Sequence, residues 1–291
     1  MRVLACVCAA AFLWIAVDGG SAAELKEPRH MTAVPDLTGY PRPLLIGHRG
    51  YPAKFPENTL ASFEGAMQAG CDMVELDVTI TDDRKVVVIH DDTLDRTTNG
   101  KGLVGFSTLE EIKRLDAGSW FNPRFSGERV PELSEVIQLT AGRCMLNIEI
   151  KESAFEETCP GDSIERQVVG LVKAYGAMDR VIVSSFETRI LRRIAAMEAP
   201  PAIALISDHA ADRAVLKMLL EMKAFSWHPR FKVLTRDQVE MMHAAGLRVF
   251  PWTVNTRRDV EKMLVLDVDG LICNDPLVAR PPEPAGGMSE R

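Results

Sequence analysis

The sequence contains little cysteine, and its cysteines follow no recognisable metal-binding pattern. Six occur in 291 residues, and those at positions 6 and 8 lie in an apolar segment near the N-terminus. The spacing of the other four matches no zinc motif, which argues against a structural zinc site. These four are Cys71, Cys144, Cys159 and Cys273. One disulfide among them and a set of buried free thiols are both compatible with the sequence.

An excess of positive charge is also absent. The chain has 34 Lys and Arg against 41 Asp and Glu, a net charge of −7, and a pI of about 5.5. An acidic chain has no general attraction for nucleic acid or for anionic membranes, so we expect neither as a partner. A negatively charged substrate would therefore have to be bound locally, by a metal ion or by a few basic side chains.

Long hydrophobic runs are missing except at the N-terminus. There, Arg2 precedes an apolar run over residues 3–17, and small residues follow at 19–23. This pattern is typical of a secretory signal peptide cleaved after Ala23, and it predicts an exported protein, periplasmic or secreted. The run is short for a membrane span, although an uncleaved anchor is the alternative. No stable span is expected once residues 1–23 are removed.

The rest of the chain reads as one domain with irregular ends. Residues 24–43 are rich in proline and charge and predict an extended lead-in, whereas residues 281–291 predict a disordered tail. Between them, a domain over residues 44–280 alternates short apolar runs with helical patterns. We see no internal repeat, low-complexity tract or linker to a second domain. The apolar runs cover residues 44–47, 73–80, 86–90, 144–150, 181–186, 202–207, 225–228, 247–255 and 270–273.

Counting these runs predicts the fold. The run at 86–90 follows the run at 73–80 so closely that no crossover helix fits, so it must return as a hairpin. Eight strands then alternate with helices, which indicates a closed (β/α)8 TIM barrel with a β-hairpin after strand 2. A helical insertion over residues 101–142 interrupts the pattern. An open doubly wound sheet is the alternative, but the glycine-rich turn of its nucleotide site is missing.

Two helix boundaries can be read from capping residues. Asn58 can cap a helix that ends at Gly70, and Thr235 with Gln238 forms a capping box for a helix that stops at Gly246. Each glycine stop lies just before the next strand, as the barrel requires.

Three acidic residues interrupt two strands that are otherwise apolar. Glu75 and Asp77 are two residues apart, so their side chains share one face of the strand, and Glu149 lies on the following parallel strand. We expect the apolar neighbours to face the helices and the three acids to face the barrel axis. Three carboxylates converging inside a barrel repel one another unless a cation binds between them. Oxygen ligands favour Ca²⁺ or Mg²⁺ over zinc.

Histidine and basic side chains follow the same strand ends, where barrel enzymes place their chemistry. His48 and His90 can each give or accept a proton near neutral pH. Arg49 and Lys151 supply positive charge for an anionic group, although Arg49 could instead pair with Glu57 or Glu75. Among the other histidines, His228 ends a strand and could line the pocket, whereas His209 and His243 lie in helical segments and are expected to be solvated.

These residues stand within a series of longer motifs. They are Gly-His-Arg-Gly at 47–50, Pro-Glu-Asn-Thr at 56–59, Glu-Leu-Asp-Val at 75–78, His-Asp-Asp-Thr-Leu-Asp-Arg-Thr-Thr at 90–98 and Glu-Ile-Lys at 149–151. Weaker ones are Ser-Ser-Phe at 184–186, Trp-Thr-Val-Asn at 252–255, Asp-Gly-Leu at 269–271 and Asn-Asp-Pro at 274–276. Together, in this order over residues 44–280, they resemble the glycerophosphodiester phosphodiesterases. One departure is Cys273, where a threonine is common.

The resemblance implies roles for eight residues and a reaction. Such an enzyme hydrolyses a small-molecule glycerophosphodiester to sn-glycerol 3-phosphate and an alcohol, through attack of the glycerol 2-hydroxyl and a cyclic phosphate. It needs one divalent cation, for which Ca²⁺ is favoured and Mg²⁺ second because exported members often use Ca²⁺. The implied metal ligands are Glu75, Asp77 and Glu149, the acid–base pair His48 and His90, the phosphate ligands Arg49 and Lys151, and the glycerol-pocket wall Trp252.

Two other functions remain open at this point. The enzyme could act on lysophospholipids or intact phospholipids, with Trp120, Phe121 and Phe125 of the insertion as an apolar approach surface. Alternatively the barrel could be a catalytically inactive scaffold, but such proteins usually lose one of the acids or histidines that this chain keeps.

Overall fold

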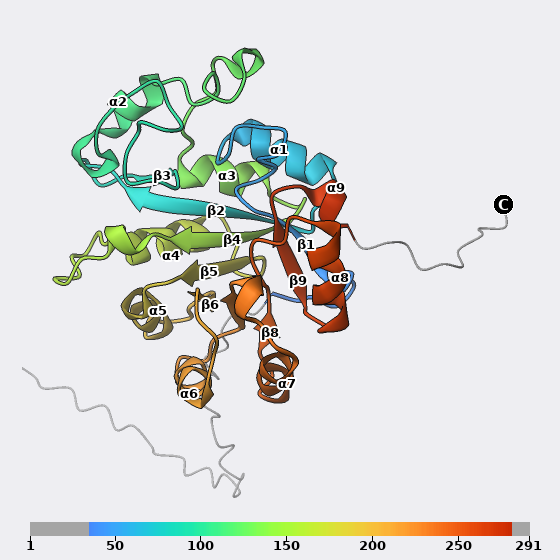
Figure 1. The fold of residues 1–291 in the computed structure, drawn as a ribbon. Coiled ribbons are helices and arrows are strands. Elements are labelled where there is room, and N and C mark those ends of the chain that lie inside the picture. The colour runs from blue at the N-terminus through green and yellow to red at the C-terminus, as the bar shows by residue number, and fades with distance from the viewer. Residues whose placement is uncertain (1–34, 281–291) are drawn as a thin grey trace, which may run out of the picture. The chain divides into compact units, whose positions relative to one another are not determined.

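Eight short strands run parallel in the computed structural model, which describes residues 35–280 (Figure 1). Hydrogen-bonded neighbours follow the order β1-β2-β4-β5-β6-β7-β8, and β9 lies beside β1. This arrangement confirms the predicted (β/α)8 barrel. The strands are β1 (Leu44–Gly47), β2 (Met73–Ile80), β4 (Met145–Ile150), β5 (Val181–Ser185), β6 (Ala202–Ser207), β7 (Ser226–Pro229), β8 (Arg248–Val249) and β9 (Gly270–Cys273).

The barrel closes between β8 and β9 without a regular ladder. The sequence predicted a strand over residues 247–255, but β8 covers only two of these. Three single hydrogen bonds continue the closure: the Asp269 amide donates to Val249, that of Ile272 to Pro251, and that of Val254 to Ile272, at 2.9–3.1 Å. Because Pro251 has no amide hydrogen, a regular strand cannot pass through this position. The chain therefore stays at the barrel wall while its side chains remain free to bend toward the centre.

The remaining strand of the sheet, β3, forms the predicted hairpin with β2. β3 (Val86–Val88) pairs antiparallel with the second half of β2, in the register Val78 opposite Val88. The short turn between them has Arg84 at φ +63°. The hairpin directs the following segment, which begins with His90, back toward the end of the barrel.

Helices alternate with the strands and pack on the outside of the barrel. One capping prediction is confirmed, because Thr235 and Gln238 form the capping box of α7. The other is wrong, since Thr59, not Asn58, caps α1. The helices are α1 (Leu60–Gln68), α2 (Leu109–Arg114), α3 (Leu133–Leu139), α4 (Ile164–Ala174), α5 (Thr188–Ala195), α6 (Arg213–Glu221), α7 (Arg236–Ala244), α8 (Arg257–Val265) and α9 (Pro276–Ala279).

Alternating side chains of each strand build two separate apolar layers. On β2, Val74, Leu76 and Val78 belong to the large cluster that packs against the helices. A smaller cluster fills the barrel axis with residues such as Met73 and Phe250. Because successive side chains of a strand point to opposite faces, the outward direction of the apolar residues turns Glu75 and Asp77 inward.

The insertion is shorter than the sequence suggested. Its segment after β3 holds α2 and two 3-10 turns, η1 (Val104–Phe106) and η2 (Pro123–Phe125), over a small core that includes Ile89 and Ile112. However, α3 packs its buried residues into the main core and is a helix of the barrel itself. In Figure 1, α2 and its loops lie beside β3, on the opposite side of the barrel from α6 and α7.

The predicted signal peptide at residues 1–23, most of the lead-in and the tail at residues 281–291 lie outside the described residues. Residues 35–43 carry no helix or strand, and Arg42 joins them to the barrel through Asp269, with Nε 3.3 Å from Oδ1. No helix within residues 35–280 is long and apolar enough to cross a membrane. The cysteines of the described part, Cys71, Cys144, Cys159 and Cys273, are all free thiols.

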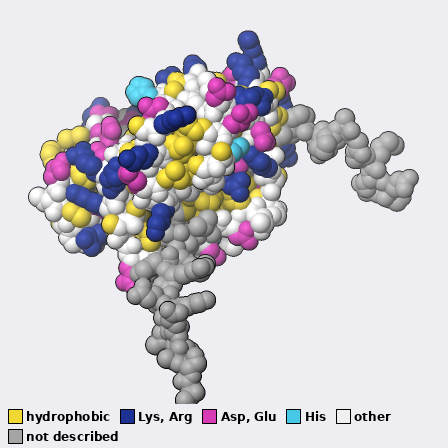
Figure 2. Space-filling view, turned by 90° about the horizontal axis from the view of Figure 1, so that it is seen from below, with side chains coloured by type: hydrophobic (Ala, Val, Ile, Leu, Met, Phe, Trp, Pro, Cys, Tyr) yellow, Lys and Arg dark blue, Asp and Glu magenta, His cyan; other side chains and the backbone are white. Residues whose placement is uncertain are grey.

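Charge is mixed on the face shown in Figure 2. Basic and acidic side chains are interspersed there, with hydrophobic side chains between them. This face carries no extended region of one sign that could attract a large polyanion.

Candidate active site

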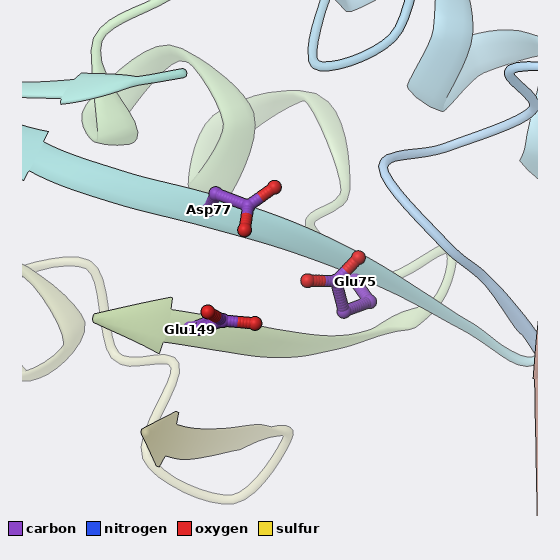
Figure 3. A group of neighbouring side chains, drawn as sticks. All are labelled: Glu75, Asp77 and Glu149. Atoms are coloured by element: carbon purple, nitrogen blue, oxygen red, sulfur yellow. The ribbon is translucent and has the colours of Figure 1, made fainter. Parts of the chain in front are cut away.

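Three carboxylates meet at the end of two adjacent barrel strands. Glu75 and Asp77 project from β2, and Glu149 projects from β4, where it lies directly opposite Asp77 (Figure 3). One oxygen from each lies within 4.8 Å of the others, and the three side chains are almost fully buried. Two ligands of a Ca²⁺ ion, each at 2.3–2.6 Å, are at most about 5 Å apart, so this spacing suits one cation.

Burial and mutual repulsion disfavour the charged forms of Glu75 and Glu149, and a bound cation would offset both effects. Burial, followed by the charges of Asp77 and Glu149, raises the pKa of Glu75 well above its usual value. Burial and the charge of Asp77 likewise raise the pKa of Glu149 to about 7. One oxygen of Glu75, Oε1, is buried without any hydrogen-bond partner. An all-oxygen donor set with an unpartnered carboxylate oxygen fits a hard divalent cation such as Ca²⁺ or Mg²⁺.

Two basic side chains border the acids. Burial alone would raise the pKa of Asp77, but the charges of Arg49 and Lys151 lower it below its usual value. Arg49 Nε lies 3.4 Å from Asp77, and Lys151 Nζ lies 3.0 Å from Glu149 and 3.6 Å from Asp77. Arg49 also pairs with Glu57 at 2.8 Å, which was the structural alternative for this residue. Arg49 and Lys151 nevertheless both line the same pocket as the acids.

His48 follows β1 and is held by a residue from the other end of the chain. Its Nδ1 lies 2.7 Å from Oδ1 of Asn274, which can only accept, so the ring carries its proton on Nδ1. The backbone amide of Asn274 donates to Oδ1 of Asn255, at 2.8 Å. Burial, together with the charge of Arg49, lowers the pKa of His48 to about 4. A neutral ring with an unprotonated Nε2 is prepared to accept a proton.

His90 has an acidic partner instead. Its Nδ1 lies 2.7 Å from Oδ1 of Asp91, and Arg96 joins Asp91 to Glu57 through two charged hydrogen bonds on each side. Arg96 holds the pKa of the Asp91 carboxyl well below its usual range. A carboxylate beside Nδ1 orients the imidazole. The two histidines therefore differ in their partners, which are an amide oxygen for His48 and a carboxylate for His90.

The loop after β1 depends on unusual backbone geometry. Arg49 has φ +54° and its amide donates to Oε2 of Glu75 at 2.7 Å. Gly50 follows at φ +88°, and a Cβ there would lie 2.4 Å from Oγ of Ser62. Non-glycine residues in this region are strained and often found at functional sites. This backbone conformation directs the amide of Arg49 to Glu75 and its side chain to Asp77.

A single pocket joins these groups. Its volume is about 150 Å³, well above the roughly 10–15 Å³ of the smallest cavity that holds one water. The predicted residues His48, Arg49, Glu75, His90, Glu149, Lys151 and Trp252 all line it, together with Asn147, Phe186, Ile206, His228 and Ile272. Asp77 lies behind this lining, within reach of the other two acids. The ring of Trp252 packs edge-on against Phe186, with centroids 5.7 Å apart.

The family of the chain follows from comparison with known proteins. A family model described as the glycerophosphoryl diester phosphodiesterase family matches residues 48–278. The chain belongs to this family. The match begins directly after β1 and includes every residue that lines the pocket.

Individual relatives agree with this assignment. A glycerophosphodiester phosphodiesterase of Caldanaerobacter subterraneus subsp. tengcongensis is 44% identical over 234 residues, which cover 80% of this chain and 94% of that protein. A glycerophosphodiester phosphodiesterase of Bacillus altitudinis is 36% identical over 236 residues, which cover 80% of this chain and 94% of that protein. The solved structure of an Oleispira antarctica phosphodiesterase, in complex with the product sn-glycerol-3-phosphate, superposes with a TM-score of 0.75 at 31% sequence identity. The match covers 82% of this chain and 95% of that one. The protein is therefore an enzyme of the glycerophosphodiester phosphodiesterase class.

Some residues beside the pocket were given no role at the histidines from the sequence, although they stand within the quoted motifs. Asn274 contacts His48, and Asp91 contacts His90. Arg96 joins Asp91 to Glu57. Asn58 was assigned to a helix cap, whereas its side chain donates to Asp77 at 2.9 Å.

The remaining histidines divide as follows. His228 lines the pocket, as the position at a strand end allowed. His243 lies outside the pocket on α7, where its side chain is 26% exposed and its Nε2 lies 2.8 Å from Asp269. His209 is exposed in the loop before α6.

Proposed function

We propose that the enzyme hydrolyses glycerophosphodiesters to sn-glycerol 3-phosphate and an alcohol, with a divalent cation held by Glu75, Asp77 and Glu149. The observation that carries this proposal is the convergence of three carboxylates, two differently partnered histidines and two basic side chains on one pocket. The product complex of the Oleispira antarctica relative supports the same substrate class.

The charges of the site suit a phosphodiester. Three acids and two basic side chains leave one negative charge, and a divalent cation converts this to one positive charge. A phosphodiester carries one negative charge, so the filled site is complementary to it. When bound, the cation would neutralise the phosphoryl oxygens and the charge that develops on them. Arg49 and Lys151 bind and orient the same oxygens from the side of the pocket.

The different partners of the two histidines assign their roles. His48 accepts the proton of the glycerol 2-hydroxyl on Nε2, and the oxygen forms a bond to phosphorus. The bond from phosphorus to the alcohol oxygen breaks, and His90 gives that oxygen its proton. In the second half, water attacks the cyclic phosphate, His90 takes a proton from the water, and His48 returns its proton to the 2-oxygen. Asn274 and Asp91 hold the two rings in place for both halves.

The metal is proposed to be Ca²⁺, with Mg²⁺ as the second choice. The donors are carboxylate oxygens on two rigid strands, and Glu75 and Glu149 can each offer a second oxygen. Ca²⁺ accepts six to eight oxygens with flexible geometry, whereas Mg²⁺ demands a regular octahedron and keeps its waters.

Action on lipid substrates has less support from the structure. The aromatic residues proposed for an apolar approach surface pack mainly on one another, with Phe121 and Phe125 centroids 5.8 Å apart and Phe125 and Phe55 centroids 5.5 Å apart. Only Trp120 of the three is more than a third exposed, at 39%. Core packing therefore accounts for these aromatic side chains.

The test is a substrate panel measured with several metals. The purified enzyme would be stripped with chelator and then assayed for sn-glycerol 3-phosphate release from glycerophosphocholine, glycerophosphoethanolamine and a lysophospholipid. Ca²⁺, Mg²⁺, Mn²⁺ and Zn²⁺ would be added separately. We expect release from the two soluble diesters, restored best by Ca²⁺. Failure to release product with any metal, or a clear preference for the lysophospholipid, would overturn the proposal.

We also propose that the enzyme is exported, on the basis of the apolar segment and small residues at positions 3–23. N-terminal sequencing of the protein from fractionated cells is expected to give a mature chain that begins close to Glu24. An unprocessed chain in the cytoplasmic fraction would contradict export.

A further inference from the structure

Besides Oε1 of Glu75 and Nε of Arg49, two further buried polar atoms of the pocket have no hydrogen-bond partner. They are Oδ1 of Asn147, whose residue is 1% exposed, and Nδ1 of His228, whose residue is 0% exposed. Both residues line the 150 Å³ pocket beside the metal-site acids. A buried polar atom without a partner is costly and rare in native proteins, so each such atom calls for an explanation. A ligand group that enters the pocket would supply the missing partner.

His228 is held so that one ring nitrogen is left for a ligand. Its Nε2 lies 2.9 Å from Oγ of Ser226, its ring stacks on Phe250 at 5.1 Å, and its carbonyl accepts from the indole of Trp252 at 2.9 Å. These contacts fix the ring and leave Nδ1 open. Burial lowers the pKa of His228 to about 3, so the ring is neutral. A neutral imidazole can donate or accept at this nitrogen, depending on its tautomer, and a hydroxyl matches either state.

Asn147 lies on β4 two residues before Glu149, so both side chains point to the same face. It pairs in register with Glu75 on the neighbouring strand, one step deeper in the barrel than the pair of Asp77 and Glu149. The amide therefore stands level with Glu75 and one step below the carboxylates of Asp77 and Glu149. The pocket walls between these polar groups are largely apolar, with Phe186, Ile206 and Ile272.

We propose that Asn147 and His228 bind the terminal hydroxyl of the substrate glycerol through the two atoms that have no partner within the protein. This inference rests on the proposed function, because it concerns the substrate of the same site. The apolar walls accommodate the three carbons, while these two uncharged polar groups receive the hydroxyl farthest from phosphorus. An acyl ester at that oxygen removes the hydrogen that it could donate to them.

A pair of substrates isolates the contribution of this hydroxyl. Glycerophosphocholine would be compared with the phosphocholine diester of propane-1,2-diol, which keeps the 2-hydroxyl that attacks phosphorus but lacks the terminal hydroxyl. For the unaltered enzyme, we expect kcat/KM to favour glycerophosphocholine at least tenfold, because a site built to bind a hydroxyl rejects the analogue that lacks it. The ratio is measured on one preparation, so a partly unfolded fraction cancels.

Matched variants then assign the effect to the two residues. In His228→Asn the amide takes the place of Nδ1, so the substrate ratio is expected to stay above tenfold. In His228→Gln the polar group reaches the place of Nε2 instead, and the ratio is expected to fall severalfold. Asn147→Leu, which replaces the amide by an apolar group of similar shape, is expected to lower the ratio independently. Thermal melting followed by circular dichroism would confirm that each variant is folded.

The possible outcomes separate this inference from the proposed function. An unaltered enzyme that is inactive on glycerophosphocholine with every metal would refute the proposed function. An active enzyme with a ratio near one would refute only the hydroxyl-binding role. The same holds if the ratio is large but unchanged in both His228→Gln and Asn147→Leu, because other residues would then recognise the hydroxyl. A ratio that falls in these two variants and persists in His228→Asn supports the inference.

Discussion

His48 donates a hydrogen bond from Nδ1 to Oδ1 of Asn274 over 2.7 Å, although 226 residues separate the two in the chain. The contact exists because β9 closes the barrel against β1, which brings the residues after each strand together. It fixes the tautomer of His48 and leaves Nε2 for the substrate. Asn274 is thus a positioning residue, whose contribution can be tested through the protonation of its partner.

We expect Asn274→Asp to change the pH dependence of the enzyme. A carboxylate beside His48 stabilises the protonated ring, so the pKa of the base rises by about one unit or more. Because the base must be unprotonated to act, the acidic limb of the kcat/KM profile should move to higher pH by the same amount. Asn274→Ala should instead lower kcat about tenfold without this displacement. Steady-state kinetics from pH 3 to 9, a range that includes the pKa of about 4 of the unaltered His48, would measure both. Coincident acidic limbs for Asn274→Asp and the unaltered enzyme would contradict the assignment.

The opposite roles of the two histidines predict different responses to the leaving group. His48→Ala and His90→Ala should each lower kcat on glycerophosphocholine by about two orders of magnitude or more, the scale of general acid–base catalysis. A glycerophosphodiester of 4-nitrophenol needs no proton on its leaving oxygen. His90→Ala should therefore recover most of its loss on this substrate, whereas His48→Ala should not. The release of 4-nitrophenol in the first turnover would be compared at saturating substrate, because His90 also acts in the later hydrolysis of the cyclic phosphate. Equal recovery by both variants would refute the assigned roles.

Removing one acid should weaken the dependence on metal. Glu75→Gln loses a charge and an anionic ligand, so the Ca²⁺ concentration for half-maximal activity should rise at least tenfold. Glu64→Gln is a matched control, since Glu64 pairs with Arg143 on the surface at 2.7 Å, away from the pocket. Its metal titration should coincide with that of the unaltered enzyme. An unchanged titration for Glu75→Gln would remove this residue from the ligand set.

The crowding of the acids also predicts how the metal-free enzyme responds to pH. The pKa of Glu149 is about 7 in the folded chain, above its unfolded value near 4.5. Such a group stabilises the fold below about pH 4.5, and this contribution is lost as pH rises toward 7. At 1.36 kcal/mol per pKa unit, the free energy of unfolding in chelator should fall by about 3 kcal/mol over this window at most. Denaturant unfolding at pH 5 and pH 7.5 measures the loss.

Two additions test the cause of that loss. Saturating Ca²⁺ should remove the decline, because the metal binds the ionised carboxylates and stabilises the folded state. Glu149→Gln should reduce the decline even in chelator, since the titrating group is absent. A decline that is equally large in Glu149→Gln would place its origin elsewhere in the protein.

The acidic residues could be located from the sequence because their signal is local. The side chains of a strand alternate, and Val74, Leu76 and Val78 define the outer face, so the direction of Glu75 and Asp77 follows without knowing the rest of the barrel. The hairpin at β3 was equally accessible, since the turn was too short for a helix. Periodicity and connection length were therefore enough to predict the barrel and the inward direction of the acids.

Residues that act across the barrel could not be located in this way. The role of Asn58 illustrates the reason. Asparagine is a good helix cap, and the sequence offers no sign that this residue has φ +56° and donates from its side chain to Asp77 instead. The neighbouring Thr59 takes the cap. Likewise, the open atoms of Asn147 and His228 are visible only once every possible partner has a position. Such properties depend on packing between distant segments and leave no periodic trace.

The close approach at Gly50 provides a test of how the loop after β1 is held. A Cβ at this residue would meet Oγ of Ser62 at 2.4 Å and its carbonyl carbon at 2.6 Å. Ser62 holds the loop from both sides, since its Oγ accepts from the Tyr51 amide and donates to the Arg49 carbonyl. Gly50→Ala must therefore displace either α1 or the backbone that carries Arg49.

Gly127 separates backbone strain from this steric effect, because it has φ +100° but no atom within 4 Å of a built Cβ. Gly127→Ala should cost about 1–2 kcal/mol of stability through the left-handed backbone alone, with activity retained. Gly50→Ala should cost clearly more, about 3 kcal/mol or above, and should lower kcat/KM of the remaining folded enzyme because Arg49 and its amide lose their positions on the acids. Urea unfolding and steady-state kinetics measure the two quantities. Equal costs for the two variants would show that the contact with Ser62 does not hold the loop.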